Sequence, residues 1–135
     1  MEESGYEIHL SGDSRDYGFE KAGPLTLHEE PPESGFYKLV GRVRNIGDDV
    51  RKSDIHIRLL HILGVSLGQP ISETTNGMGF EIEPLDEGAI EVTPDGDLVW
   101  KSGTVCVITT IPQKLPYFDP AHRRDTTCHI TRLGT

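Results

Sequence analysis

The sequence is poor in apolar residues and in positive charge. Hydrophobic residues make up 35% of the 135 residues, and no stretch approaches the roughly 20 apolar residues of a transmembrane helix. The first residues are acidic and no apolar stretch follows them, so we expect neither a secretory signal nor insertion into a membrane. Only 13 basic side chains stand against 22 acidic ones, which gives a net charge of −9. Because this charge repels phosphate backbones, we expect no nucleic-acid partner.

The acidic surplus has two interpretations. An acid-rich surface with few lysines suits a salt-rich environment and is typical of a halophilic source. Plain solubility in an ordinary environment explains the same composition. Both interpretations stay open at the level of the sequence.

Cysteine is also scarce, with Cys106 and Cys128 as the only two. Both stand in apolar or β-branched surroundings, where free cysteine often behaves as a small buried hydrophobe. Two thiols on neighbouring strands could also form a disulfide if their Cα atoms lay within about 7 Å. Because no secretion signal is recognised, we expect free thiols.

Glycine and proline, in contrast, are abundant, at 15 and 9 residues. Turn residues at this frequency disfavour long helices and favour short strands. The length fits one domain, since domains cluster at about 100–150 residues. We therefore predict a single domain over residues 1–135 with an all-β fold. The expected architecture is an antiparallel immunoglobulin-like or Greek-key β-sandwich of about eight strands.

Alternation of apolar and polar residues predicts where the strands lie. The predicted strands cover residues 6–10, 25–27, 36–45, 54–65, 80–83, 89–92, 98–100, 104–111 and 126–133. The short stretch 25–27 is expected at a sheet edge. The β-branched, uncharged stretch 104–111 is expected at the centre, with 126–133 beside it. Within 54–65 the alternation breaks at Leu59-Leu60, which we interpret as a bulge or as burial of both faces.

Two turn motifs are predicted to fix the ends of strands. After 36–45, the Asn45 side chain is expected to bond the downstream backbone, and Gly47 is expected to take a positive φ. The Pro-Asp-Gly sequence within 93–97 predicts a tight hairpin that joins 89–92 to 98–100.

Three stretches together resemble a known kind of sandwich module. Residues 39–47 form a strand that ends in Asn-x-Gly, residues 55–64 supply a partner strand, and residues 84–92 form a Pro-Leu-Asp-Glu-Gly turn that feeds a strand. In this order they are similar to the FxLYD family of bacterial and archaeal surface domains, over about half of the chain. Leu59-Leu60-His61 stands where that family has an aromatic pair and an aspartate. The resemblance implies a non-enzymatic module used for contact or spacing.

The six histidines raise the question of a metal site, since zinc needs three or four converging ligands. The best candidate cluster is His122, Asp125, Cys128 and His129, and the competing interpretation is a polar loop that leads into an ordinary strand. Metal signatures such as His-Glu-x-x-His and paired Cys-x-x-Cys are missing. We therefore predict no metal and no cofactor. A small metal- or ligand-binding protein that uses residues 112–129 is kept as the alternative function.

Signatures of catalysis are missing from the sequence as well. No Gly-x-Ser-x-Gly elbow is present. Cys128 and His129 are neighbours in sequence, so on a strand they face opposite sides and cannot form a nucleophile and base pair locally. We therefore predict that the protein is not an enzyme.

The proline-rich segment 111–124 is the strongest candidate for contact with other proteins. It holds three prolines, two aromatic residues and the only adjacent arginine pair of the chain, and a long loop of this kind commonly serves binding. The predicted interface residues are Leu115, Tyr117, Phe118, Arg123, Arg124 and Trp100. In the competing interpretation, Leu115 and Phe118 plug the open end of the sandwich and Trp100 packs in the core.

These observations favour a non-catalytic structural or interaction subunit. Its expected role is as a building block of a larger assembly, of virion or cell-surface type, or as an adhesive or spacer module. The expected partners are other protein subunits, in a homo- or hetero-oligomer.

Overall fold

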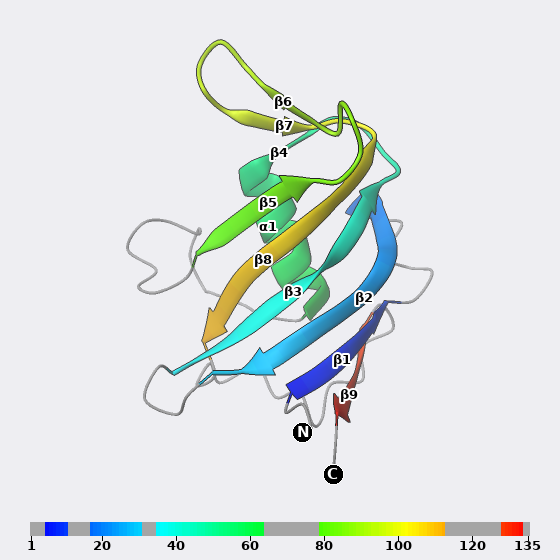
Figure 1. The fold of residues 1–135 in the computed structure, drawn as a ribbon, viewed down its shortest axis with the longest axis vertical. Coiled ribbons are helices and arrows are strands. Elements are labelled where there is room, and N and C mark those ends of the chain that lie inside the picture. The colour runs from blue at the N-terminus through cyan, green and yellow to red at the C-terminus, as the bar shows by residue number, and fades with distance from the viewer. Residues whose placement is uncertain (1–4, 11–16, 31–34, 64–78, 113–127, 134–135) are drawn as a thin grey trace.

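A computed structural model of the chain describes residues 5–10, 17–30, 35–63, 79–112 and 128–133. Two antiparallel sheets account for most of these residues, which confirms the predicted all-β, sandwich-like class (Figure 1). The immunoglobulin-like topology stays a prediction. The elements are β1 (Gly5–Leu10), β2 (Phe19–Glu29), β3 (Phe36–Asn45), β4 (Val50–Arg51), α1 (Lys52–Leu63), β5 (Phe80–Pro84), β6 (Ile90–Val92), β7 (Leu98–Trp100), β8 (Gly103–Pro112) and β9 (Cys128–Leu133).

The larger sheet has six strands in the order β5-β8-β3-β2-β1-β9. Strands β1, β2 and β3 follow one another as an antiparallel meander. Strand β8 then returns beside β3, and β5 pairs with the outer side of β8. The smaller sheet has three strands in the order β4-β7-β6. It stands at one end of the larger sheet (Figure 1).

The positions of two strands differ from the prediction. The predicted edge strand 25–27 is part of β2, which is 11 residues long and lies between β1 and β3. Strand β9 pairs with β1, so the prediction that 126–133 lies beside 104–111 is wrong. The reason is that β8 already has a partner on each side, β3 and β5. The interior position predicted for 104–111 is confirmed by the same pairing.

The largest difference is that the predicted strand 54–65 is helical over its described part. Helix α1 covers Lys52–Leu63. Its buried apolar residues are Ile55, Leu59, Leu60, Ile62 and Leu63. This spacing is that of one helix face. The predicted alternation counted Ile57 among the apolar residues of one strand face, whereas Ile57 is 36% exposed on the outer side of the helix. The partner strand that the FxLYD resemblance required is therefore absent from the described part of the chain.

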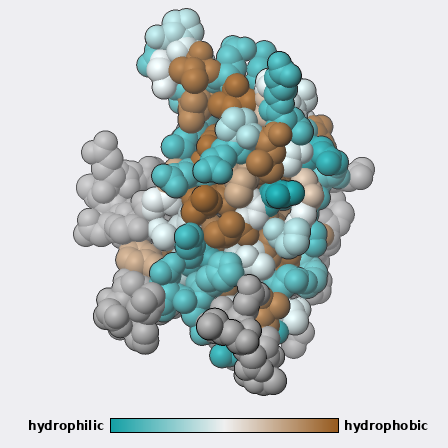
Figure 2. Space-filling model, in the orientation of Figure 1, coloured by the Kyte–Doolittle hydropathy of each residue, from teal (hydrophilic) through white to brown (hydrophobic). Residues whose placement is uncertain are grey.

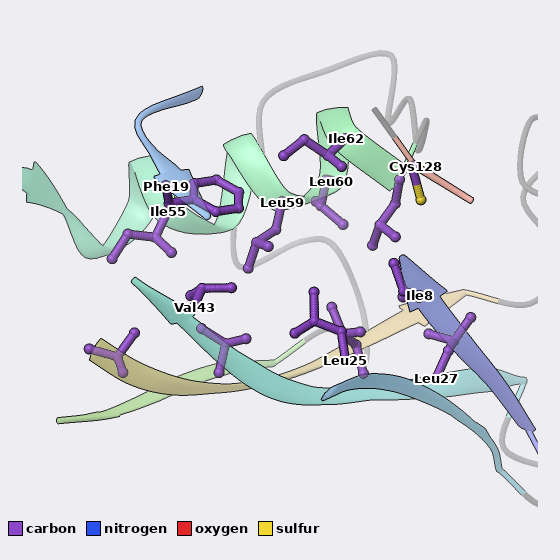
Figure 3. Close-up of a cluster of buried hydrophobic side chains, with 14 of the residues drawn as sticks. Ile8, Phe19, Leu25, Leu27, Val43, Ile55, Leu59, Leu60, Ile62 and Cys128 are labelled. Atoms are coloured by element: carbon purple, nitrogen blue, oxygen red, sulfur yellow. The ribbon is translucent and has the colours of Figure 1, made fainter. Parts of the chain in front are cut away.

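The core lies between α1 and one face of the six-stranded sheet, as Figure 3 shows. Alternation in each strand directs every second side chain to this face. From the helix come Ile55, Leu59, Leu60 and Ile62, and they face Ile8, Leu25, Leu27 and Val43 of the sheet. All eight are at most 2% exposed. Full burial of each such side chain contributes about 1.5–3 kcal/mol, so this layer is the main source of stability.

Asn45, the last residue of β3, joins the two sheets. Its side chain is buried, and its Nδ2 lies 3.1 Å from the carbonyl oxygen of Asp48, 3.1 Å from that of Trp100 and 3.0 Å from that of Lys101. The end of the large sheet is thereby tied to the end of β7. Burial makes these contacts important, because an unpaired buried carbonyl costs free energy.

The turn that follows β3 is partly as predicted. The backbone N–H of Gly47 donates to Oδ1 of Asn45 at 2.9 Å, which confirms the predicted side-chain contact. Gly47 does not have a positive φ, so that part of the prediction is wrong. What the position requires is the lack of a side chain, because a Cβ at Gly47 would lie 3.2 Å from the Cα of Gly18.

Candidate functional site

Most of the predicted site residues lie outside the described part of the chain. This holds for the interface residues Leu115, Tyr117, Phe118, Arg123 and Arg124, and for His122 and Asp125 of the candidate metal cluster.

Trp100 is described, and the structure corrects its assignment to an interface. The side chain is 1% exposed. Its indole N–H donates to the carbonyl oxygen of Gly103 at 3.1 Å, and its ring packs against Phe19 with centroids 6.3 Å apart. Trp100 is thus a core residue and offers no surface for a contact.

Cys128 also faces the core, where it is fully buried (Figure 3). Its side chain belongs to the hydrophobic core cluster. Neither Cys106 nor Cys128 forms a disulfide, as predicted. Among the side chains that the structure describes, no three histidine, cysteine, aspartate or glutamate groups lie close enough together to hold a metal ion.

The hairpin formed by β6 and β7 is built as its sequence predicts. The turn between the strands closes through two backbone bonds, from Thr93 N–H to Asp97 C=O and from Gly96 N–H to Thr93 C=O, both 2.8 Å long. Gly96 has a φ of +86°, which glycine adopts without strain. The Asp97 carboxylate accepts from the N–H of Leu98 at 2.8 Å. These bonds make the hairpin a fixed support for its side chains.

One face of this hairpin is apolar along its whole length. Directly opposed residues share a face, and the register pairs Ile90 with Trp100 and Val92 with Leu98. Val50 of β4 is opposite Trp100 and extends the face. Exposure rises along it, from 1% at Trp100 and 3% at Val50 to 63% at Val92. We call the outer part, formed by Ile90, Val92 and Leu98, the hairpin surface.

The opposite face of the hairpin has Val99 at its centre with charged residues around it, and these charges are paired with one another. Arg51 forms an ion pair with Asp97, and Lys101 forms one with Glu91 at 3.4 Å. The hydrogen bond from Arg51, together with that from the backbone of Leu98, lowers the pKa of Asp97. Exposed pairs of this kind add little stability. The hairpin surface, in contrast, consists of apolar side chains that are partly exposed to solvent.

The figures place this surface at one end of the molecule. In Figure 1 the β6–β7 turn extends beyond the other elements. Figure 2 shows apolar side chains next to hydrophilic ones on this projection. The sequence predicts the hairpin but does not identify its apolar face as a candidate site. Alternation marks the face, whereas only the packing shows that Trp100 is covered and Val92 is not.

A second feature that the sequence did not reveal is a buried histidine on α1. His56 is 5% exposed and stacks on Phe80, with ring centroids 4.5 Å apart. Thr109 Oγ1 donates to the carbonyl oxygen of Gly79 at 2.7 Å, so it accepts from Nε2 of His56 at 2.9 Å. Burial, and to a smaller extent the charge of Lys52, lower the pKa of His56 to about 4.

The arrangement around His56 anchors the helix to the sheet. The Thr109 hydroxyl has one proton, and the Gly79 carbonyl already accepts it, so the hydroxyl is not free to lose that proton to the imidazole as an activated nucleophile would. The neutral imidazole instead links α1 to β8 and, through stacking, to β5. This contact has a structural explanation and needs no catalytic one.

Comparison with known proteins adds no relative. No family model, no curated protein and no solved structure matches this chain. Within the described residues, none of the helical structure is long and apolar enough to cross a bilayer.

Proposed function

We propose that this protein is a non-catalytic interaction module that docks onto other protein subunits through the hairpin surface. The observation that carries the proposal is the apolar face that begins in the core at Trp100 and ends at Val92, which is 63% exposed. Large apolar side chains on a projecting element are common at protein contacts.

The geometry of the hairpin suits a docking element. Its turn is fixed by backbone bonds, and its base is held by the buried ring of Trp100. Little conformational freedom remains to be lost when a partner covers Val92 and Leu98. Preorganisation of this kind increases affinity, because ordering a flexible loop on binding costs free energy.

The hairpin surface is too small to be a whole interface. A standard interface buries about 800 Å² on each partner, and this surface has only a few side chains. The contact would extend to neighbouring parts of the chain. The predicted contact residues between Leu115 and Arg124 remain part of this proposal.

The finer role is that of a building block in a multi-copy assembly. A virion or extracellular assembly, or an adhesive or spacer module, agrees with the acidic composition. Copies of a chain with net charge −9 repel one another at low salt. Screening shortens that repulsion to about 10 Å at 0.1 M salt, so a halophilic setting would favour assembly.

The test measures association of the purified protein with itself. Static light scattering at low and high salt should show a mass that rises with salt in the unmodified chain. Val92→Glu should remain monomeric at the same concentrations, because a charge on the hairpin surface would have to be buried in the contact.

The matched control is Ile57→Glu on the outer side of α1. Ile57 is also an exposed apolar residue, at 36%, and this substitution adds the same charge far along the chain from the hairpin. Its association should equal that of the unmodified chain. A monomer at every ionic strength, or equal loss of association in both variants, would show that the hairpin surface is not a contact between copies of this chain.

A further inference from the structure

Strand β6 is the outer strand of the smaller sheet. Within the described part of the chain, β6 pairs only with β7, and β7 separates it from β4. The hairpin to which it belongs extends beyond the other elements in Figure 1. The side of β6 that faces away from β7 is therefore a strand edge that another chain can approach.

The backbone groups of Ile90 and Val92 point outward from this edge. At the end of the hairpin, the N–H of Thr93 faces the other strand and donates to the carbonyl oxygen of Asp97 at 2.8 Å. In an antiparallel pair, residues alternate between those whose backbone groups face the partner strand and those whose groups face away. Because Thr93 faces the β7 side, Glu91 does so as well, and Ile90 and Val92 face outward.

The same two residues also carry apolar side chains that are open to solvent. Val92 is 63% exposed and Ile90 is half-buried. Outward backbone groups and uncovered apolar side chains thus coincide at β6. An edge with both properties is a template for pairing with a strand of another chain.

The β5 edge of the larger sheet is built differently. It carries the exposed residues Glu81 and Glu83 and ends in Pro84, which has no N–H to donate. Charged residues and proline at an edge discourage strand pairing. Strand β6 has no proline, and the carboxylate of its one charged residue, Glu91, lies 3.4 Å from the ammonium group of Lys101. Strand pairing is thus discouraged at β5 and left open at β6.

We propose that two copies of this chain associate by antiparallel pairing of their β6 strands, about a two-fold axis at Glu91. The inference rests on the proposed function, because it uses the hairpin surface as the contact. In this register Ile90 of each copy lies opposite Val92 of the other, so the outward N–H and C=O groups of both residues find partners. Opposed residues share a face of the sheet, so the two hairpin surfaces join into one apolar face.

A second copy suits this edge because the register is self-complementary. A two-fold contact uses the same residues on both sides, and here it places apolar side chains against apolar ones. The two Glu91 side chains are opposed on the other face, where each has Lys101 of its own chain nearby. Salt screens the repulsion that remains between them, so the pairing should strengthen as the salt concentration rises.

The first experiment is static light scattering of the full chain at high salt, with a substitution at Val92. Val92→Pro removes the N–H that points outward and keeps an apolar side chain. Proline is tolerated where the N–H side of an edge strand faces solvent, so the pairing of β6 with β7 is kept. Association should weaken by about tenfold or more, because the two-fold axis removes one backbone bond on each side.

The matched control is Val92→Thr, which keeps the backbone N–H and the β-branched shape of the side chain. Its association should stay close to that of the unmodified chain. Circular dichroism and the fluorescence of Trp100 verify that each variant is folded.

A disulfide trap tests the register. Opposed residues of a non-hydrogen-bonded pair, such as the two copies of Glu91, have Cα atoms about 4.5 Å apart, which a disulfide can span. Glu91→Cys should therefore give a covalent dimer under mild oxidation of the full chain, seen by non-reducing gel electrophoresis. Asp95→Cys, in the exposed turn of the same hairpin, should give no more covalent dimer than the unmodified chain. This measurement decides the question even where Val92→Pro does not fold.

The outcomes separate the strand pairing from the proposed function. Loss of association in Val92→Pro, together with a covalent dimer of Glu91→Cys, supports the pairing. If Val92→Glu prevents association and Val92→Pro does not, the hairpin surface is a contact through its apolar face alone, and the strand pairing is overturned. The pairing is also overturned if Glu91→Cys forms no more covalent dimer than Asp95→Cys, or if the unmodified chain is a monomer at every ionic strength. Docking of the hairpin surface onto a different protein is unaffected by these last two results.

Discussion

The junction at Asn45 allows the sharpest test of how the two sheets are held together. Asn45 is 4% exposed, and its amide group faces the carbonyl oxygens of Asp48, Trp100 and Lys101. Two substitutions separate its contributions. Asn45→Ala removes the side-chain contacts, whereas Asn45→Asp keeps the shape of the side chain and replaces the donor with a charged acceptor.

The magnitudes follow from the number of bonds that can form at once. The amide nitrogen has two protons, so at most two of the three carbonyl contacts are full bonds at one time, and Oδ1 accepts a third bond from Gly47. At about 1 kcal/mol for each bond, Asn45→Ala should lower the free energy of unfolding by about 3 kcal/mol.

Asn45→Asp should be worse than Asn45→Ala at neutral pH. The aspartate can still accept from Gly47. Its second oxygen would place a negative charge about 3 Å from the carbonyl oxygens of Trp100 and Lys101. A buried charge without a partner costs about 3–5 kcal/mol, in addition to the lost donor bonds.

The assay is urea unfolding at pH 7, followed by the fluorescence of Trp100. This residue is the only tryptophan of the chain and is buried at the junction, so its emission reports on the region that the substitutions affect. Asp49→Ala, at an exposed position of the same turn, should change the free energy of unfolding by less than about 0.5 kcal/mol. A stable Asn45→Asp variant, or a loss below about 1 kcal/mol in Asn45→Ala, would refute the proposed role of these bonds.

Two further predictions concern the interior of the larger sheet. Gly41→Ala should lower the free energy of unfolding by about 1–3 kcal/mol, because the new Cβ would lie 2.9 Å from the Cα of Leu25. Gly79→Ala meets nothing within 4 Å and should be nearly neutral in the same urea titration. Because the pKa of His56 is lowered to about 4, the unfolded chain takes up a proton below pH 6.5 while the folded chain does not, so stability should fall from pH 6.5 towards 4. His56→Gln should flatten that part of the pH profile of unfolding, and an unchanged slope would show that His56 is not its source.

The positions of most strands could be predicted from the sequence. Residues 36–45 show why: alternate apolar residues mark one buried face, and β3 spans Phe36–Asn45 as expected. The Pro-Asp-Gly turn likewise predicted the β6–β7 hairpin. Both signals are local, since alternation and turn geometry depend on residues a few positions apart.

The helix could not be recognised in the same way. The alternation from Ile55 to Leu59 is compatible with a strand, and it includes Ile57, which is exposed in α1. The double leucine at 59–60 was the one departure from period two, and it corresponds to the helix face that covers the sheet. Short apolar segments often fit both the helical period of about 3.6 residues and the strand period of two. Packing against the uncovered face of the sheet therefore determines that this segment is a helix.

The sequence by itself determined the all-β class, most strand boundaries and the turn of the hairpin. The tertiary structure alone decided that β9 lies beside β1, that α1 closes the core, and that Trp100 is covered while Val92 is exposed. The physical reason is the distance along the chain over which each interaction acts. Backbone preferences act between neighbours in the chain, whereas strand order and burial depend on which distant surfaces exclude water together.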